Sequence, residues 1–135
     1  MMYVTRRETF SAAHRLYNPS LSIAENERVF DKCANPGGHG HNYILEVTVA
    51  GETDPVTGYL VDLKKLKELI RKEVIEKVDH KNLNSDVDFL VGINPTAENL
   101  AKAFWTILSQ KMNGGTLFSI RLRETENNVV EYRGA

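Results

Sequence analysis

Alternating hydrophobic and polar positions predict two strands in the first part of the chain. In the segment 3–13, Val4, Phe10 and Ala12 share one face at period two, while threonine and arginine occupy the other. The segment 42–50, NYILEVTVA, alternates in the same way. We therefore expect two half-buried strands, separated by a long connection over residues 15–38 that contains one candidate short helix, SIAENERVF.

Two later segments have helical spacing. Asp62 is a suitable N-cap for a helix that runs to Val78, and Thr96 for a second helix that ends before Asn113-Gly114-Gly115. The apolar stripe of the first helix consists of Leu63, Leu66, Leu69, Ile70, Val74 and Val78. The stripe of the second helix consists of Leu100, Ala101, Phe104, Ile107, Leu108 and Met112. Both helices therefore need an apolar surface to cover.

The C-terminal segment predicts a hairpin of two strands, 117–124 and 129–133, joined near Asn127-Asn128. The element order ββααββ indicates an α+β fold, with a four-stranded antiparallel sheet and two helices on one face. A chain of 135 residues is expected to form one domain, 1–135. Because four strands do not close a barrel, the outer strands keep unpaired edges, and we expect a homo-oligomer whose sheets join across subunits.

Composition narrows the possible functions. The net charge of −1 argues against a nucleic-acid partner, and no apolar run approaches the roughly 20 residues that span a membrane. The start of the chain lacks the apolar core of a signal peptide, so we expect a cytoplasmic protein. A single cysteine forms no internal disulfide.

Three histidines form a candidate metal site. In His39-Gly40-His41 the two rings project from the same side of an extended segment, about 6 to 7 Å apart. His14 ends the first strand, which would pair with the second, so all three rings can meet at one rim of the sheet. Three neutral imidazoles with an open fourth position are typical of a catalytic Zn²⁺ site.

The only cysteine, Cys33, precedes His39 by six residues. As a fourth ligand it would close the site and make it structural. Held at a distance from the ion, its thiol would instead be favoured as a thiolate that acts as a base or nucleophile. The spacing alone leaves both alternatives open.

Three acidic residues and a further histidine complete the candidates. Glu124 falls on the apolar face of its strand, where its two oxygens suit a ligand with two parallel N–H donors, or where it reaches water at the strand end. Asp79-His80 closes the first helix, and His80 is either a titrating acid or base or a cap of the helix carbonyls. Glu98 complements the dipole of the second helix.

Several motifs, taken together and in order, resemble the 6-pyruvoyl-tetrahydropterin synthase family over nearly the whole chain. These motifs are FSAAHRL, KCANPGGHGHNY, the GETDPVTG turn, VDLKKLK, VDHKNLN, PTAENLA and ETENNVVEY. The resemblance implies a tunnelling fold, in which trimers close a barrel and two trimers stack as a hexamer.

The resemblance also implies roles for individual residues. It places zinc ligands at His14, His39 and His41, and a catalytic trio at Cys33, Asp79 and His80. It further places a pterin-anchoring carboxylate at Glu124 and backbone contacts to the pterin at Thr96 and Ala97. The family often has threonine where this chain has Ala97, a difference of little consequence if the backbone makes the contact.

The implied reaction converts 7,8-dihydroneopterin triphosphate, a small-molecule substrate, to 6-pyruvoyl-tetrahydropterin with loss of triphosphate. A related possibility is 6-carboxy-tetrahydropterin synthase of the queuosine pathway, in which the cysteine typically lies closer to the HGH sequence. A third possibility is a non-catalytic module that binds a pterin or purine and keeps zinc for structural reasons.

Overall fold

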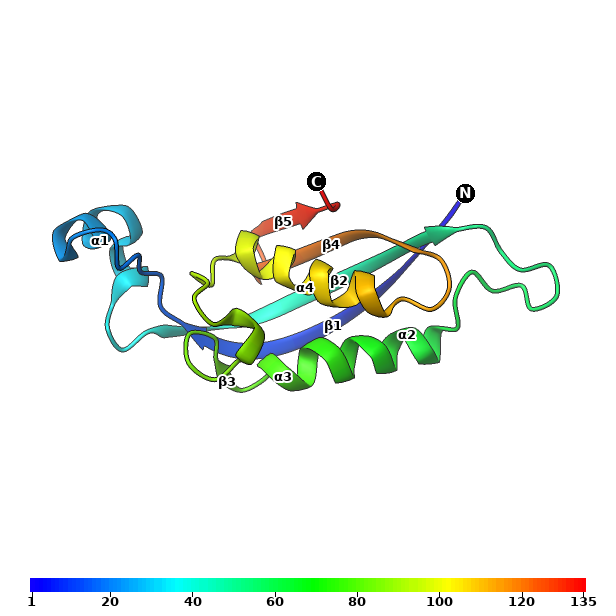
Figure 1. Cartoon of the computed structure of the whole chain (residues 1–135), viewed down its shortest axis with the longest axis horizontal. Helices are drawn as coiled ribbons and strands as arrows, with labels where there is room; N and C mark the ends of the chain where they lie inside the picture. Colours follow the sequence, from blue (N-terminus) through cyan, green and yellow to red (C-terminus); the bar gives the residue numbers. More distant parts are fainter.

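A twisted sheet forms one layer of the molecule in the computed structural model, which describes all residues 1–135. The sheet order is β3-β1-β2-β4-β5 (Figure 1). The strands are β1 (Met2–His14), β2 (His39–Gly51), β3 (Lys81–Asn82), β4 (Thr116–Thr125) and β5 (Asn128–Tyr132). Strands β1 and β2 pair antiparallel without interruption, from Met2 opposite Gly51 to His14 opposite His39. The predicted alternation is therefore confirmed, and both strands extend slightly further than predicted.

Helices cover one face of this sheet. The first is a continuous helical rod of α2 (Leu63–Ile70), the π turn η2 (Arg71–Ile75) and α3 (Glu76–Val78), and the second is α4 (Ala97–Lys111). The rod and α4 lie against the same side of the sheet (Figure 1). Both predicted N-caps are confirmed, because Asp62 Oδ1 accepts from the Lys64 N–H and Thr96 Oγ1 accepts from the Asn99 N–H. None of the helices is long and apolar enough to cross a membrane.

The core lies between the helices and the sheet. Twenty-three buried apolar side chains form one cluster, drawn from the inward faces of the long strands and the apolar stripes of the helices. The π turn adds one residue to the helical repeat, so that Val74 and Ile75 are both buried. Leu63, which the sequence placed in the stripe, is instead 55% exposed because it is the first residue of α2.

The sheet is mixed and five-stranded, so the prediction of four antiparallel strands is only partly correct. The short strand β3 pairs in parallel with the end of β1, with Lys81 opposite Ala12. Two residues are too few to show any periodicity, and for this reason the sequence did not reveal this strand. The structure also has helix α1 (Ile23–Phe30) and two 3₁₀ turns, η1 (Asp31–Ala34) and η3 (Asp88–Leu90).

Helix α1 is part of the long connection between β1 and β2, and it lies at one end of the molecule, beyond the sheet (Figure 1). Ser22 and Glu25 form a capping box at its start. Asn26 is 1% exposed, and its amide group donates to the carbonyls of Asn18, Leu21 and Ser22. A buried amide with this many partners gives the connection a defined shape.

Candidate metal centre and active site

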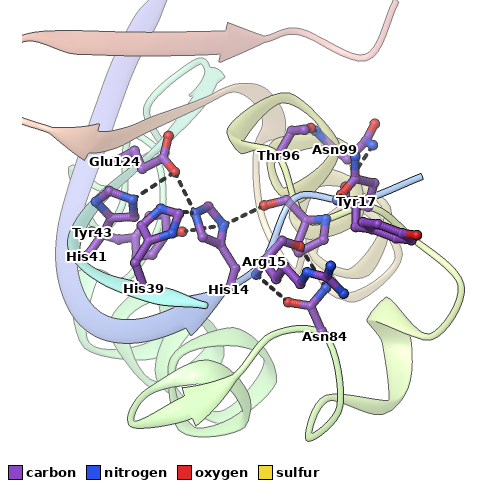
Figure 2. A network of polar contacts seen from close by, with 12 residues as sticks. His14, Arg15, Tyr17, His39, His41, Tyr43, Asn84, Thr96, Asn99 and Glu124 are labelled. Carbon is purple, nitrogen blue, oxygen red and sulfur yellow. Dashed lines mark hydrogen bonds and ion pairs between the residues drawn. The ribbon is translucent and has the colours of Figure 1, made fainter. Parts of the chain in front are cut away.

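Strand pairing brings the three predicted histidines together. His14 and His39 are directly opposite each other on the last rung of β1 and β2, and His41 follows on the same face of β2. The ring centroids are 4.7 Å apart for His14 and His39, 5.1 Å for His14 and His41, and 4.7 Å for His39 and His41. The three rings meet at one rim of the sheet, as the sequence predicted (Figure 2).

Glu124, near the end of β4, joins these histidines. Its Oε1 lies 3.0 Å from His14 Nε2 and 3.3 Å from His41 Nε2. One ligand atom from each of the four residues lies within 4.8 Å of every other, so the group can hold a metal ion. The sequence identified Glu124 by its position on an apolar face, but it did not indicate that the histidines would be its partners.

The hydrogen bonds of His14 leave room for a proton or a cation among these donors. His14 Nδ1 lies 2.9 Å from the carbonyl oxygen of Pro95, which can only accept, so this nitrogen carries a proton. In the neutral ring the lone pair is therefore on Nε2, which faces His39 Nε2 at 3.2 Å and the carboxylate of Glu124 at 3.0 Å. Groups that present lone pairs to one another need a proton or a cation between them.

The spacing of the donors also suits zinc. Tetrahedral Zn²⁺ with bonds of about 2.0 to 2.1 Å to nitrogen sets neighbouring ligand atoms about 3.3 to 3.4 Å apart. The separation of 3.2 Å between His14 Nε2 and His39 Nε2 is close to this value. The Pro95 carbonyl fixes the ring orientation of His14 in the way that carbonyl partners of metal-bound histidines do.

Electrostatics keep the donors in the protonation states that a metal needs. Burial, together with the neighbouring His14, lowers the pKa of His39. Burial and the two other histidines likewise lower the pKa of His41 against the opposing effect of Glu124. The contact with His14 and the nearby histidines hold the pKa of Glu124 below its usual range, against the opposing effect of burial. Neutral imidazoles and an ionised carboxylate are the forms that bind a divalent cation.

Tyr43 supports the same site from two residues beyond His41. Its side chain is fully buried, it stacks on Phe10 with a centroid distance of 4.7 Å, and its hydroxyl oxygen lies 3.2 Å from His14 Nδ1. Burial raises the pKa of Tyr43, so the hydroxyl keeps its proton. The sequence placed Tyr43 on the face of His39 and His41 but gave it no role.

Cys33 lies in the turn η1 and is partly buried. Burial and the negative charges of Glu124 and Asp31 raise the pKa of its thiol, so the chain alone does not favour the thiolate. Cys33 is not among the residues whose ligand atoms converge, a set that consists of His14, His39, His41 and Glu124. The structure therefore favours the alternative in which the thiol is not a fourth ligand.

Asp79 and His80 follow α3 along the open edge of β1. Asp79 Oδ1 accepts from the Ser11 N–H at 2.9 Å and lies 3.0 Å from His80 Nδ1, and the Ser11 N–H lowers the pKa of Asp79. The His80 N–H donates to the Ser11 carbonyl at 2.6 Å. The imidazole of His80 is 82% exposed, and no hydrogen bond joins it to Cys33. A single chain thus positions these two residues without a hydrogen bond to the thiol.

Thr96 and Ala97 start α4 directly after Pro95, whose carbonyl holds His14. Ala97 is buried, whereas Glu98 is exposed in the first turn of the helix. The start of α4 is therefore next to the histidine cluster, and the Pro95 contact links the two (Figure 2). The sequence did not reveal Pro95 as a partner, because a backbone acceptor has no side-chain signal.

Comparison with known proteins agrees with this geometry. The family model for 6-pyruvoyl tetrahydropterin synthase matches residues 3–135. The chain belongs to this family. It is 46% identical over 131 residues to the 6-pyruvoyl tetrahydrobiopterin synthase of Pongo abelii, a match that covers 97% of this chain and 90% of the relative.

A solved structure and a more distant relative complete the comparison. The structure of Caenorhabditis elegans 6-pyruvoyl tetrahydropterin synthase superposes with a TM-score of 0.94 at 41% identity, covering 99% of this chain and 96% of the other. The 6-carboxy-5,6,7,8-tetrahydropterin synthase of Aquifex aeolicus is 28% identical, with 96% of each chain covered. The resemblance inferred from the motifs is therefore confirmed, and similarity to the pyruvoyl enzymes is the stronger of the two.

Proposed function

We propose that this protein is a 6-pyruvoyl-tetrahydropterin synthase, which converts 7,8-dihydroneopterin triphosphate to 6-pyruvoyl-tetrahydropterin and releases triphosphate. The 46% identity to a relative of that name, over 97% of the chain, supports the substrate and the reaction. The convergence of three imidazoles and one carboxylate is the structural observation that carries the proposal. In this reaction the redox change is internal to the substrate, so no external reductant is required.

His14, His39 and His41 would hold a zinc ion. Bound there, the ion supplies Lewis-acid polarisation that acidifies hydroxyl and adjacent C–H groups of a substrate side chain. The Pro95 carbonyl and the Tyr43 hydroxyl keep the His14 ring in the orientation that aims Nε2 at the site. These contacts hold the site in place before any ligand arrives.

Glu124 would anchor the pterin. Its Oε1 is directed at His14 and His41, whereas no hydrogen bond is made by its Oε2, and 27% of the side chain is exposed. An ionised carboxylate with one open oxygen suits N–H donors on the edge of a heterocycle. The backbone of Thr96 and Ala97, next to Pro95, would complete the pterin contacts.

Cys33 would remove a proton from carbon in the substrate side chain. Because burial and nearby carboxylates raise the pKa of the thiol, the thiolate needs a positive neighbour. His80 can provide one, with Asp79 holding it through Nδ1 at 3.0 Å and leaving the rest of the ring exposed. His80 then returns protons as the ring tautomerises and triphosphate leaves.

Because no hydrogen bond joins Asp79 or His80 to Cys33 within one chain, we propose that they complete the trio across a subunit boundary. Strand β3 covers only a short part of the β1 edge, and β5 has no partner on its outer side, so both sheet edges are open to other subunits. A trimeric barrel stacked as a hexamer would pair these edges. The cytoplasmic location expected from the sequence stays a prediction.

The experiment that tests the proposed function supplies 7,8-dihydroneopterin triphosphate to the purified protein and measures free triphosphate with and without a zinc chelator. Mass spectrometry of the pterin then identifies the product. A pyruvoyl side chain and chelator-sensitive release support the proposal. A carboxylated product would assign the chain to the 6-carboxy reaction, and binding of a pterin without any release would indicate a non-catalytic module.

A further inference from the structure

The turn that carries Cys33 is attached to the two residues that directly follow His14. The Leu16 N–H donates to the Cys33 carbonyl at 2.7 Å. The Arg15 Nε–H donates to the carbonyl of Ala34, the next residue, at 2.8 Å, and Ala34 is 6% exposed. Two consecutive carbonyls of η1 are therefore held from the same short stretch of chain that begins at a histidine of the metal centre.

Arg15 is itself held in place by Asn84. The Arg15 N–H donates to Asn84 Oδ1 at 2.7 Å, and Asn84 Nδ2 donates to the Arg15 carbonyl at 2.8 Å (Figure 2). The Asn84 side chain thus occupies both backbone groups of Arg15, as a neighbouring strand would. The guanidinium also lies over the ring of Tyr17, with its central carbon 4.1 Å from the ring centroid.

We propose that Arg15 is a positioning residue that fixes the Cys33 thiol relative to the metal centre. The inference rests on the proposed role of Cys33 as the base. Arg15 and its contacts with Ala34 and Asn84, here called the clasp, directly follow His14. A displacement of η1 would therefore change the distance between the thiol and a substrate held next to the histidines. A shift of about 1 Å in such a position can reduce a rate about 100-fold.

Kinetic parameters distinguish this role from direct binding of the triphosphate group. Arg15 uses Nε for the Ala34 carbonyl, and Tyr17 covers one face of its guanidinium. A phosphate-binding arginine would chiefly lower substrate affinity when it is replaced, and the KM would rise. A positioning arginine leaves substrate affinity nearly unchanged and lowers kcat.

The test compares Arg15→Met with the control Arg28→Met. Arg28 lies in α1 of the same connection, is exposed, and has no hydrogen bond or ion pair. For Arg15→Met we expect kcat to fall between about 10- and 100-fold, with a KM within about twofold of the wild type and an unchanged metal content. The control should match the wild type in all three quantities. A higher KM with unchanged kcat, or unchanged values of both, would overturn the inference.

A second measurement does not depend on turnover. The rate at which iodoacetamide alkylates Cys33 should rise several-fold in Arg15→Met without substrate, because the released turn exposes the thiol. If the wild type releases no triphosphate, the proposed function fails. If it does release triphosphate but the alkylation rate and kcat of Arg15→Met equal those of the control, only the present inference fails.

Replacement of Asn84 tests the same clasp from a residue that touches neither Cys33 nor Ala34. Asn84→Ala should lower kcat and speed alkylation in the same direction as Arg15→Met. The double variant should lose little more than the larger single loss, because both changes release one clasp. If the two single losses in kcat multiplied in the double variant, the proposed coupling would be contradicted.

A fallback is available if Arg15→Met does not fold. Asn84→Asp keeps the acceptor for the Arg15 N–H, so its kcat should fall less than that of Asn84→Ala. Equal losses in kcat would contradict the inference.

Discussion

Replacing Tyr43 by phenylalanine should weaken zinc binding while leaving the fold intact. The ring is fully buried and stacks on Phe10 at an interplanar angle of 8°, and phenylalanine preserves both features. The change removes only the hydroxyl that lies 3.2 Å from His14 Nδ1. Because no cavity forms and only one weak hydrogen bond is lost, the unfolding free energy of the metal-free protein should change by less than about 1 kcal/mol.

The loss of zinc affinity follows from the way His14 is held. Partners of the second ring nitrogen typically contribute 10- to 100-fold to metal affinity. The Pro95 carbonyl, at 2.9 Å, is the shorter of the two contacts and remains in the variant. We therefore expect zinc affinity to fall by about tenfold, the lower end of this range, which corresponds to about 1.4 kcal/mol of binding free energy.

Competition with a chromophoric chelator measures this affinity. Tyr132→Phe is the matched control, since Tyr132 packs edge-on against Trp105 and its hydroxyl makes no hydrogen bond. Its zinc affinity should equal that of the wild type. Affinities within twofold of each other for Tyr43→Phe and the wild type would refute the idea that Tyr43 supports the metal centre through His14.

Three further predictions follow from other contacts. Glu8→Gln should lower the unfolding free energy by about 2 kcal/mol in urea titrations, since the buried carboxylate accepts hydrogen bonds from Arg6 and from the half-exposed Arg71. Burial raises the pKa of Glu8, but the two arginines outweigh this effect and bring the pKa below its ordinary value of 4.5. The stabilisation by the ionised carboxylate is therefore fully present above pH 4.5 and is lost as the pH falls through the lower pKa of the folded state. The difference in unfolding free energy between the wild type and Glu8→Gln should narrow over that range. Cys33→Ala should reduce triphosphate release at least about 100-fold at unchanged zinc content, and a rate near that of the wild type would exclude the thiol as the base. Removal of metal by a chelator should abolish release and lower the melting temperature, and zinc added back should restore both; full activity of metal-free protein, confirmed by elemental analysis, would contradict this.

Sequence patterns predicted most of the fold because its main elements are long and amphipathic. Alternation in β1 and β2 and the apolar stripes of the helices record which side of each element is buried. The π turn η2 was not predicted, since a single inserted residue changes the three-and-four spacing only locally. Strand β3 depends on the edge of β1 as its partner, and its own two residues contain no pattern.

The candidate site was predictable where side chains of special chemistry stand at regular positions. His14, His39 and His41 could be grouped because β1 ends at His14 and its neighbour β2 begins at His39. Asn84 could not be connected with Arg15, 69 residues away, since an asparagine in a polar turn has an ordinary local explanation. The Pro95 carbonyl is likewise a partner that only the folded backbone brings to His14.

The central claim is that His14, His39 and His41 hold one metal ion while Cys33 stays unbound to it. Diffraction from zinc-loaded crystals, collected on both sides of the zinc absorption edge, tests it directly. The account predicts one anomalous peak at bonding distance from a ring nitrogen of each of the three histidines, with the Cys33 sulfur outside bonding distance. A peak elsewhere, or a peak bonded to that sulfur in a closed tetrahedron with substrate present, would contradict the account.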